Sequence, residues 1–280
     1  MLTFNDPKKL QAWSRLRRSK GEKIALIPTM GYLHEGHLSL IALAKKKGAK
    51  QIVVSVFVNP VQFGPNEDYE TYPRDEKADF AKCRKAGATA IFFPTPKNMY
   101  LEDHSTYVCE ELLSRGQCGA RRPGHFRGVC TVLAKLFNIV HPHFAVFGQK
   151  DYQQAQVVKR MVRDLNFDVE IAVAPIVREE TGLARSSRNT YLSDMERQNA
   201  LAISEALFAL RRKVRKLGKL PAAAVEKEIA GHLVKNDLKP DYVEAVDAET
   251  LAKVDMVKSG VAVLVAAYSG KTRLIDNIVL

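Results

Sequence analysis

The chain has 280 residues, of which 46% are hydrophobic and 26% charged, and it carries a formal net charge of +12. This length allows a large core in one or two domains, and the composition is ordinary for a soluble globular protein. No apolar run approaches the length of a membrane span, and the start, Met1-Leu2-Thr3-Phe4, lacks the basic-then-apolar layout of a secretory signal. The four cysteines form no C-x-x-C pair, so we expect free thiols and a cytoplasmic protein.

Strands and helices are predicted to alternate up to residue 176. A helix begins at Pro7 and runs to about Ser19, because proline suits the first helical position. Short apolar runs predict strands over residues 24–27, 51–58, 90–93, 144–147 and 169–173. Helices are predicted between them, over residues 38–47, 76–86, 129–140 and 152–165. This alternation is typical of an α/β domain with a mainly parallel sheet, in which ligands bind at the carboxyl ends of the strands.

The pattern changes after residue 176. A polar loop over residues 178–189 precedes a long predicted helix over 194–217 and a second one that ends near Val234. Short strands follow over residues 242–246, 261–267 and 272–276. We therefore expect two domains, residues 1–176 with the parallel sheet and residues 177–280 as a smaller α+β domain.

The segment PTMGYLHEGH, residues 28–37, joins the first of these strands to a helix. His34 and His37 are three residues apart and therefore share one helix face. A helix N-terminus offers free N–H groups and partial positive charge, and Gly31 and Gly36 allow close approach of the backbone, so the turn could bind a phosphate chain. The alternative is that the histidines only cap or pack. A zinc site is less favoured, because the His-Glu-x-x-His pattern needs a spacing of four.

Two further segments combine glycine with groups that can bind phosphate. FGQKDYQQ, residues 147–154, follows a strand and contains Gly148, Lys150 and Asp151. GLARSSRN, residues 182–189, combines two hydroxyls with two guanidinium groups. Each also has a simpler interpretation, a capped helix with a surface lysine and a polar hinge respectively.

Other polar positions are less distinctive. Gln62, just after a strand, could hold a substrate hydroxyl or carboxylate, or belong to an ordinary turn. The basic loop over residues 121–128 could contact an anion or be solvated. Asp79 could supply charge for magnesium, although a structural cap is the simpler role.

The excess positive charge lies mainly in residues 1–175, which carry +9, whereas residues 176–280 carry +3. This field would favour an anionic ligand. A nucleic acid would benefit as well, but the basic residues lack interleaved aromatic side chains and a nucleic-acid-binding motif. We therefore expect neither a nucleic-acid nor a membrane partner.

Taken together, the motifs resemble the pantothenate synthetase (pantoate–β-alanine ligase) family of the HxGH nucleotidyltransferase superfamily. The match comprises PTMGYLHEGH, NPVQFGPNEDYETYPRD, RPGHFRGV, FGQKDYQQ, VREETGLARSSRN and TRLIDN, in family order from about residue 24 to 277. The resemblance implies a Rossmann-like N-terminal domain, a smaller C-terminal domain that closes over the site, and a homodimer. It also implies a ligase that uses ATP and magnesium to join (R)-pantoate to β-alanine through pantoyl adenylate, releasing AMP and pyrophosphate.

The resemblance also assigns roles to residues. ATP would be bound by three segments: Met30, Gly31, Tyr32, Leu33, His34, Glu35, Gly36 and His37, then Gly148, Gln149, Lys150 and Asp151, then Val177, Arg185, Ser186, Ser187 and Arg188. The catalytic groups among them would be His34, His37, Lys150, Ser186, Ser187 and Arg188, with His37 as proton donor. Gln62 and Gln154 would bind pantoate, Gln62 would also lie near β-alanine, and Asp79 would be linked to magnesium.

Two positions depart from the family pattern. Arg185 stands where an apolar residue is common, and Gln149 stands where glutamate is common. Neither affects the histidine pair. The remaining alternative is another nucleotidyltransferase with the same histidine turn, which would not need the two glutamines or β-alanine.

Overall fold

The computed structural model describes residues 1–65 and 67–280. Its backbone contacts divide the chain into two compact units. Unit 1 comprises Met1–Gly148 and Val157–Ala174, and unit 2 comprises Gln149–Gln156 and Pro175–Leu280. We retain a domain boundary between residues 176 and 177 as a proposal. The contacts place one short segment of the N-terminal part, Gln149–Gln156, in unit 2.

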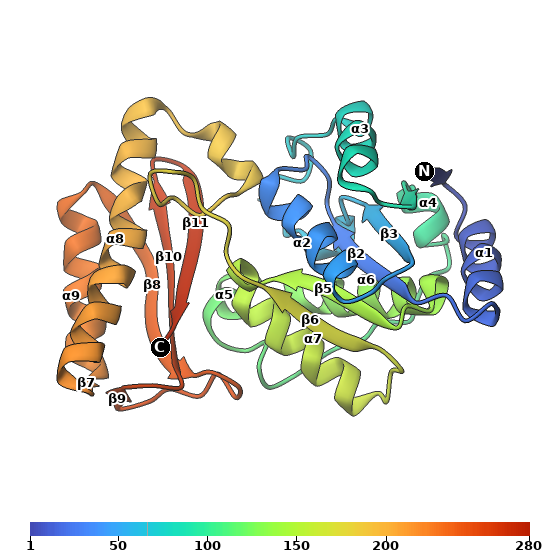
Figure 1. Cartoon of the computed structure of the whole chain (residues 1–280). Helices are drawn as coiled ribbons and strands as arrows, with labels where there is room; N and C mark the ends of the chain where they lie inside the picture. Colours follow the sequence, from blue (N-terminus) through green and yellow to red (C-terminus); the bar gives the residue numbers. More distant parts are fainter. Residues whose placement is uncertain (66) are drawn as a thin grey trace. The chain divides into compact units, whose positions relative to one another are not determined.

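Within the described residues, the strands of unit 1 form one six-stranded parallel sheet (Figure 1). The strands are β1 (Leu2–Phe4), β2 (Ile24–Thr29), β3 (Gln51–Val56), β4 (Ala90–Phe92), β5 (Phe144–Gly148) and β6 (Glu170–Ala174), in the order β1-β4-β3-β2-β5-β6. The four residues from Ile24 to Ile27 have no exposed surface. Such unbroken apolar runs are typical of parallel strands, because helices cover both faces of the sheet.

The helices of unit 1 cover the two faces of this sheet. They are α1 (Pro7–Ser19), α2 (Glu35–Lys46), α3 (Glu76–Ala86), α4 (Pro96–Met99), α5 (Gln117–Arg121), α6 (His125–Val140) and the larger part of α7 (Tyr152–Asp164). Side chains of α2 and α3 share a core cluster with alternate residues of β2 and β3. Helix α1 packs against α6. This arrangement confirms the predicted α/β class.

The order of the strands determines which loops meet in unit 1. Strand β2 lies between β3 and β5, and all three run parallel. Their carboxyl ends therefore lie at one edge of the sheet, where ligands bind in folds of this kind. The predicted motifs that begin at Pro28, Asn59 and Phe147 each include or follow one of these strand ends.

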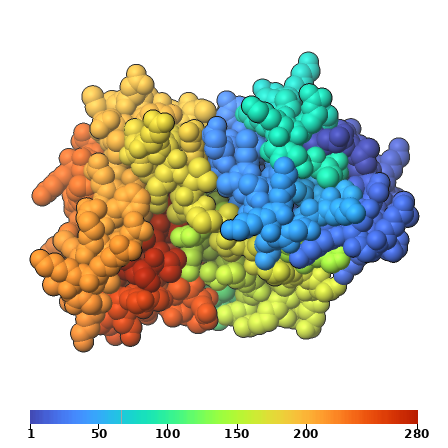
Figure 2. Space-filling model, in the orientation of Figure 1, coloured from blue at the N-terminus to red at the C-terminus, as the bar shows by residue number. Residues whose placement is uncertain are grey.

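Unit 2 is built on a small antiparallel sheet. Strand β10 (Val261–Ser269) pairs with both β8 (Leu238–Asp247) and β11 (Thr272–Val279). The helices α8 (Asp194–Leu217) and α9 (Ala222–Lys235) share the core of this sheet, and β7 (Leu220–Pro221) pairs with β9 (Met256–Val257). In Figure 2 the orange helix α8 and the red strand β11 both reach the visible surface of unit 2. The predicted smaller α+β fold is thus confirmed.

Most predicted elements agree with the structure to within a few residues, and α3 and α8 agree at both ends. Strand β1 was not predicted, because it pairs with β4 through only three residues, two of them exposed. The elements α4, α5, β7 and β9 were not predicted either, because they are too short for a periodic signal. Among the helices of the described residues, none is both long and apolar enough to cross a membrane.

Candidate active site

The turn after β2 has an unusual backbone. Gly31 and Tyr32 follow one another with φ values of 89° and 51°. A side chain at position 31 would be strained at this φ, and its Cβ would lie 2.8 Å from Val56 Cγ1 and 3.0 Å from Asp79 Oδ2. Glycine is therefore required at position 31 by both conformation and space.

Asp79 of α3 holds this turn in place. Its side chain is buried, and its two oxygens accept hydrogen bonds from the backbone N–H groups of Tyr32 at 2.8 Å and Leu33 at 2.7 Å. Burial raises the pKa of Asp79, although these two bonds and the nearby Lys82 oppose the rise. Lys82 in turn donates to the carbonyl of Leu33 at 2.7 Å. Since both carboxylate oxygens are engaged by the turn, this geometry favours a positioning role for Asp79 over the expected link to magnesium.

His34 and His37 form a reciprocal cap at the start of α2. His34 is the N-cap residue, and its Nδ1 accepts a hydrogen bond from the N–H of Gly36 at 3.1 Å. His37 Nδ1 accepts from the N–H of His34 at 3.3 Å, and the two ring centroids are 4.1 Å apart. A ring whose Nδ1 accepts carries its proton on Nε2. The cap therefore leaves each neutral ring with an Nε2–H donor, so capping and phosphate binding are compatible for this pair.

The end of β3 brings Gln62 to the same turn. Gln62 ends the 3-10 helix Pro60–Gln62 and is 8% exposed, and its Nε2 lies 3.0 Å from the sulfur of Met30. Asn59 Nδ2 donates to Gln62 Oε1 at 3.2 Å, and Asn59 Oδ1 accepts from the hydroxyl of Tyr100 at 2.8 Å. The structure thus places Gln62 beside Met30. It also adds Asn59, to which the sequence analysis assigned no role.

Helix α6 packs tightly against the backbone of Gln62. His125 Nδ1 lies 2.9 Å from the carbonyl oxygen of Gln62, and His125 Nε2 lies 3.0 Å from Arg122. A Cβ at Gly128 would lie 2.5 Å from Gln62 Cα and 2.4 Å from the carbonyl oxygen of Val61. The basic loop over residues 121–128 therefore helps to fix the position of the Gln62 backbone.

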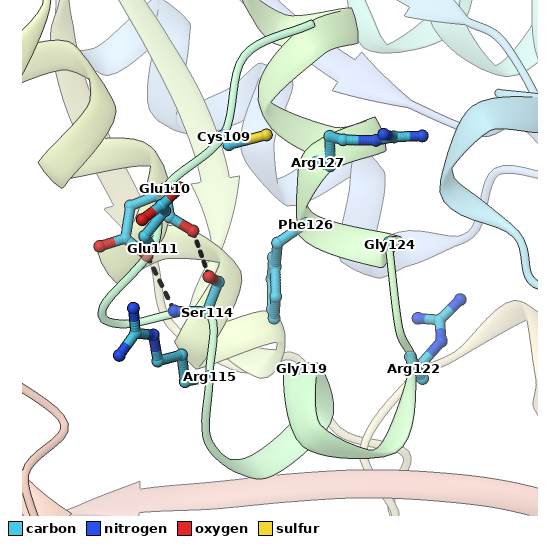
Figure 3. Close-up of a pocket in the computed structure, with 10 residues that line it drawn as sticks. All are labelled: Cys109, Glu110, Glu111, Ser114, Arg115, Gly119, Arg122, Gly124, Phe126 and Arg127. Atoms are coloured by element: carbon cyan, nitrogen blue, oxygen red, sulfur yellow. Dashed lines mark hydrogen bonds between the residues drawn. The ribbon is translucent and has the colours of Figure 1, made fainter.

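A separate pocket of about 420 Å³ in unit 1 is lined partly by residues of this loop (Figure 3). Arg122 belongs to its lining and pairs with Glu67, while Arg127 lies 4.3 Å from the ring centroid of Tyr107. The carboxylate of Glu110 accepts hydrogen bonds from three consecutive backbone N–H groups, from residue 112 to residue 114. Among the described residues, the predicted catalytic, nucleotide and substrate positions are not part of this lining.

In unit 2, Lys150 lies beside the serine and arginine loop. Lys150 belongs to the 3-10 helix Gln149–Asp151, and its side chain is 19% exposed. A small cleft is lined by Lys150, Ala184, Ser186 and Asp276, among others. Two predicted nucleotide-binding segments, far apart in the sequence, therefore share one cleft of this unit.

The serine and arginine loop has its own internal hydrogen bonds. Ser186 caps the 3-10 helix Ser187–Tyr191 by accepting from the N–H of Arg188 at 3.3 Å. Arg185 donates its backbone N–H to the carbonyl of Val177 at 2.9 Å. Asn189, which the sequence did not single out, is 4% exposed and donates to the carbonyl of Ala184 at 3.1 Å. These bonds give the loop a defined conformation.

The predicted site residues divide between the two units. Unit 1 carries Met30, Gly31, Tyr32, Leu33, His34, Glu35, Gly36, His37, Gln62, Asp79 and Gly148. Unit 2 carries Gln149, Lys150, Asp151, Gln154, Val177, Arg185, Ser186, Ser187 and Arg188.

The sequence is similar to known proteins over almost its whole length. A family model described as "Pantoate-beta-alanine ligase" matches residues 2–279. Pantothenate synthetase of Thermotoga petrophila is 53% identical, with 97% of this chain and 96% of the relative covered. Pantothenate synthetase of Clostridium acetobutylicum is 50% identical, with 98% and 96% covered.

Solved structures give the same result. Pantothenate synthetase from Thermus thermophilus matches with a TM-score of 0.92 and 43% identity, over 99% of both chains. A pantoate-beta-alanine ligase from Francisella tularensis, complexed with beta-gamma ATP and beta-alanine, matches with a TM-score of 0.82 and 32% identity, over 100% of this chain and 97% of the other. The chain therefore belongs to the pantoate-beta-alanine ligase family, as an enzyme that condenses pantoate with β-alanine to pantothenate in an ATP-dependent reaction.

Proposed function

We propose that this enzyme forms pantothenate through pantoyl adenylate. In the first step a pantoate carboxylate oxygen attacks the α-phosphorus of ATP, and the bond from that phosphorus to the bridging oxygen breaks, so that pyrophosphate leaves. Charge develops on the phosphate oxygens, and fixed hydrogen-bond donors stabilise it. The observation that best supports the proposal is the reciprocal cap of His34 and His37, which leaves an Nε2–H donor on each ring at a helix N-terminus.

The turn after β2 acts on the phosphates. His34 and His37 donate hydrogen bonds from Nε2 to the phosphate oxygens on which charge develops, and the rings keep their protons. The N–H groups of Tyr32 and Leu33 are engaged by Asp79, so their contribution to binding is to shape the turn. Glu35 and Gly36 begin α2, where Gly36 allows close approach of the nucleotide.

The predicted nucleotide residues of unit 2 have separate tasks. Lys150 carries a mobile positive charge to the α-phosphate, and the hydroxyls and guanidinium groups of Ser186, Ser187 and Arg188 bind the triphosphate. The backbone from Gly148, at the end of β5, through Gln149 to Asp151 binds adenosine, together with the backbone at Val177. Arg185 adds a further cation to this loop. The shared cleft of Lys150 and Ser186 supports this assignment.

Two glutamines bind the acid substrate. The amides of Gln62 and Gln154 can both donate and accept, which suits the hydroxyl and carboxylate groups of pantoate. Gln62 also lies near β-alanine. In the second step the β-alanine nitrogen attacks the acyl carbon, the bond from that carbon to the phosphate oxygen breaks, AMP leaves, and the amine loses a proton to water or phosphate.

Magnesium would be held mainly by the phosphates of ATP and by water, and it would offset the negative charge of those phosphates. Among the described residues there is no group of three or more His, Cys, Asp and Glu side chains suited to a metal ion. Magnesium at nucleotide sites commonly keeps several waters and binds substrate phosphates, which agrees with this arrangement.

We further propose that the enzyme forms a homodimer and that it is located in the cytoplasm. The four cysteines, all within the described residues, are free thiols, which supports a reducing compartment. Light scattering of the purified protein tests the dimer, and a monomer mass at working concentration would contradict it.

The exchange of labelled pyrophosphate into ATP tests the adenylate directly. With pantoate and magnesium but without β-alanine, we expect exchange, because the first step is reversible before the amine attacks. Omission of pantoate or removal of magnesium by a chelator should abolish exchange. Exchange that does not need pantoate, or net ligation without any exchange, would contradict the proposed route.

The residue assignments need matched variants. His37→Ala and Lys150→Ala should each lower adenylate formation by about 10²-fold or more, comparable with loss of an electrostatic donor. Their controls are His232→Ala and Lys213→Ala, which change exposed side chains of α9 and α8. A variant at His37 or Lys150 that matches its control in rate would remove that residue from the proposed mechanism.

A further inference from the structure

The end of strand β11 contains two buried polar residues that the proposed mechanism does not use. Asp276 is 5% exposed and Asn277 is 2% exposed. They belong to the motif TRLIDN, which carried part of the resemblance to the family but no chemical role. Successive side chains of a strand point to opposite faces, so the two residues reach different segments of unit 2.

Asn277 makes three hydrogen bonds to the segment that carries Lys150. Its Nδ2 donates to the carbonyl oxygens of Gln149 and Lys150, both at 3.0 Å. Its Oδ1 accepts from Gln149 Nε2 at 3.2 Å. Only an NH₂ group can donate to two carbonyls, which determines the orientation of the amide.

Asp276 acts on the neighbouring loop. Its carboxylate pairs with both terminal nitrogens of Arg178, at 2.6 Å and 2.9 Å. Arg178 also donates to the carbonyl of Gly182 at 3.1 Å, and it forms a β-bridge with Ala184. Adjacent residues of β11 therefore fix the segment with Lys150 and the start of the serine and arginine loop.

We infer that Asn277 is a positioning residue for the reaction, and that it acts by holding the backbone from which the Lys150 side chain extends. The inference rests on the proposed role of Lys150 at the α-phosphate. A lysine side chain is long and flexible, so the position of its ammonium group depends on where its backbone is fixed. A displacement of about 1 Å at a reacting group can lower a rate by about 100-fold.

The fit of Gln149 supports the inference. Gln149 donates from its amide Nε2 to Asn277 Oδ1 at 3.2 Å. The Oδ1 of Asn277 is therefore used by the Gln149 side chain. Its Nδ2 group can then donate both of its hydrogens to the carbonyl oxygens of Gln149 and Lys150.

The substitution Asn277→Asp removes the two hydrogen bonds that residue 277 donates and keeps the one that it accepts. An aspartate still accepts from Gln149 Nε2, but it has no donor for the two carbonyls and places negative charge against them. We expect a 10- to 100-fold lower rate of adenylate formation, by the effect of misplacement on rate. The KM for pantoate should stay unchanged, because the pantoate glutamines are left as they are.

The control is Asn236→Asp in the same unit. Asn236 Nδ2 donates to the carbonyl of His232 at 2.9 Å, at the end of α9. This change also removes an amide-to-carbonyl bond, and it should leave the rate of adenylate formation unchanged. If Asn277→Asp does not fold, Asn277→Ser, which can reach one carbonyl at most, replaces it with a smaller expected loss.

A double-mutant cycle with Lys150→Ala decides between positioning and general support. If Asn277 acts through Lys150, Asn277→Asp should cost little further rate in the Lys150→Ala background. An equal fold-loss in both backgrounds, or no loss in the wild type, would overturn the inference while the role of Lys150 stands. A near-normal rate for Lys150→Ala alone would instead refute the proposed role of Lys150, and the inference with it.

Discussion

Replacing Asp79 with asparagine tests whether this residue holds the turn after β2. Asparagine has nearly the same shape, but it offers one carbonyl oxygen where the carboxylate offers two. The N–H groups of Tyr32 and Leu33 now bond separately to Oδ2 and Oδ1, so one of them would lose its acceptor. The change therefore removes one specific bond from a buried turn.

The size of the effect follows from that bond. A buried donor left without a partner costs about 1–3 kcal/mol, and the surviving bond loses its charge assistance, worth about 1 kcal/mol more. Relief of the buried charge offsets part of this, since burial raises the pKa of Asp79. We expect a net loss of about 2 kcal/mol in the free energy of unfolding, together with slower adenylate formation because Tyr32 would leave its positive φ.

The assay uses the single tryptophan of the chain. Trp13 lies on α1 with its ring centroid 5.6 Å from that of Phe4, so its fluorescence in denaturant reports the unfolding of unit 1. The control is Asp75→Asn, one turn earlier. Asp75 caps α3 by accepting from the N–H of Ala78 at 2.9 Å, and asparagine caps a helix about as well.

The two variants should differ clearly without ATP or magnesium. Asp79→Asn should unfold at lower denaturant than the wild type, and Asp75→Asn should not. Equal stability of the two variants, with a raised magnesium requirement only in Asp79→Asn, would refute the positioning role and restore the expected link to magnesium.

Three other predictions concern unit 1. Gly128→Ala should raise the KM for pantoate and lower stability by about 1–3 kcal/mol, because its Cβ would push the backbone of Gln62 away; kinetics with an unchanged KM would contradict this. Burial raises the pKa of Cys83 and Cys130 to about 12, so thiol reagents at neutral pH should modify exposed Cys109 in the native protein well before these two, as peptide mapping would reveal. These pKa values lie above the value of 9.0 for a free thiol, so the two buried thiols contribute fully to stability below pH 9.0. That contribution should be lost as the pH rises towards about 12, and the free energy of unfolding measured across this range would check it.

The sequence was sufficient for the main elements of the fold. Apolar runs such as Ile24–Ile27 and the helix signals around Asp194–Leu217 arise from local patterns, and the structure confirms them. Strand β1 was missed, because its stability comes from pairing with β4 far along the chain and two of its three residues are exposed.

The candidate site shows the same limit. The motifs located the turns, but the functions of Asp79 and Asn277 depend on partners 47 and about 128 residues away. The residues next to Asp79 in the sequence do not distinguish a carboxylate that binds two backbone N–H groups from one that binds a metal ion. Likewise, only the structure shows that Asn59 donates a hydrogen bond to the side chain of Gln62.

The most direct measurement of the central claim is the formation of AMP and pantothenate from ATP, magnesium, pantoate and β-alanine, with each component omitted in turn. We predict that both products form together in the complete mixture and that each omission stops pantothenate formation. Pantothenate formed without ATP, or a folded protein with no turnover in the complete mixture, would contradict the account.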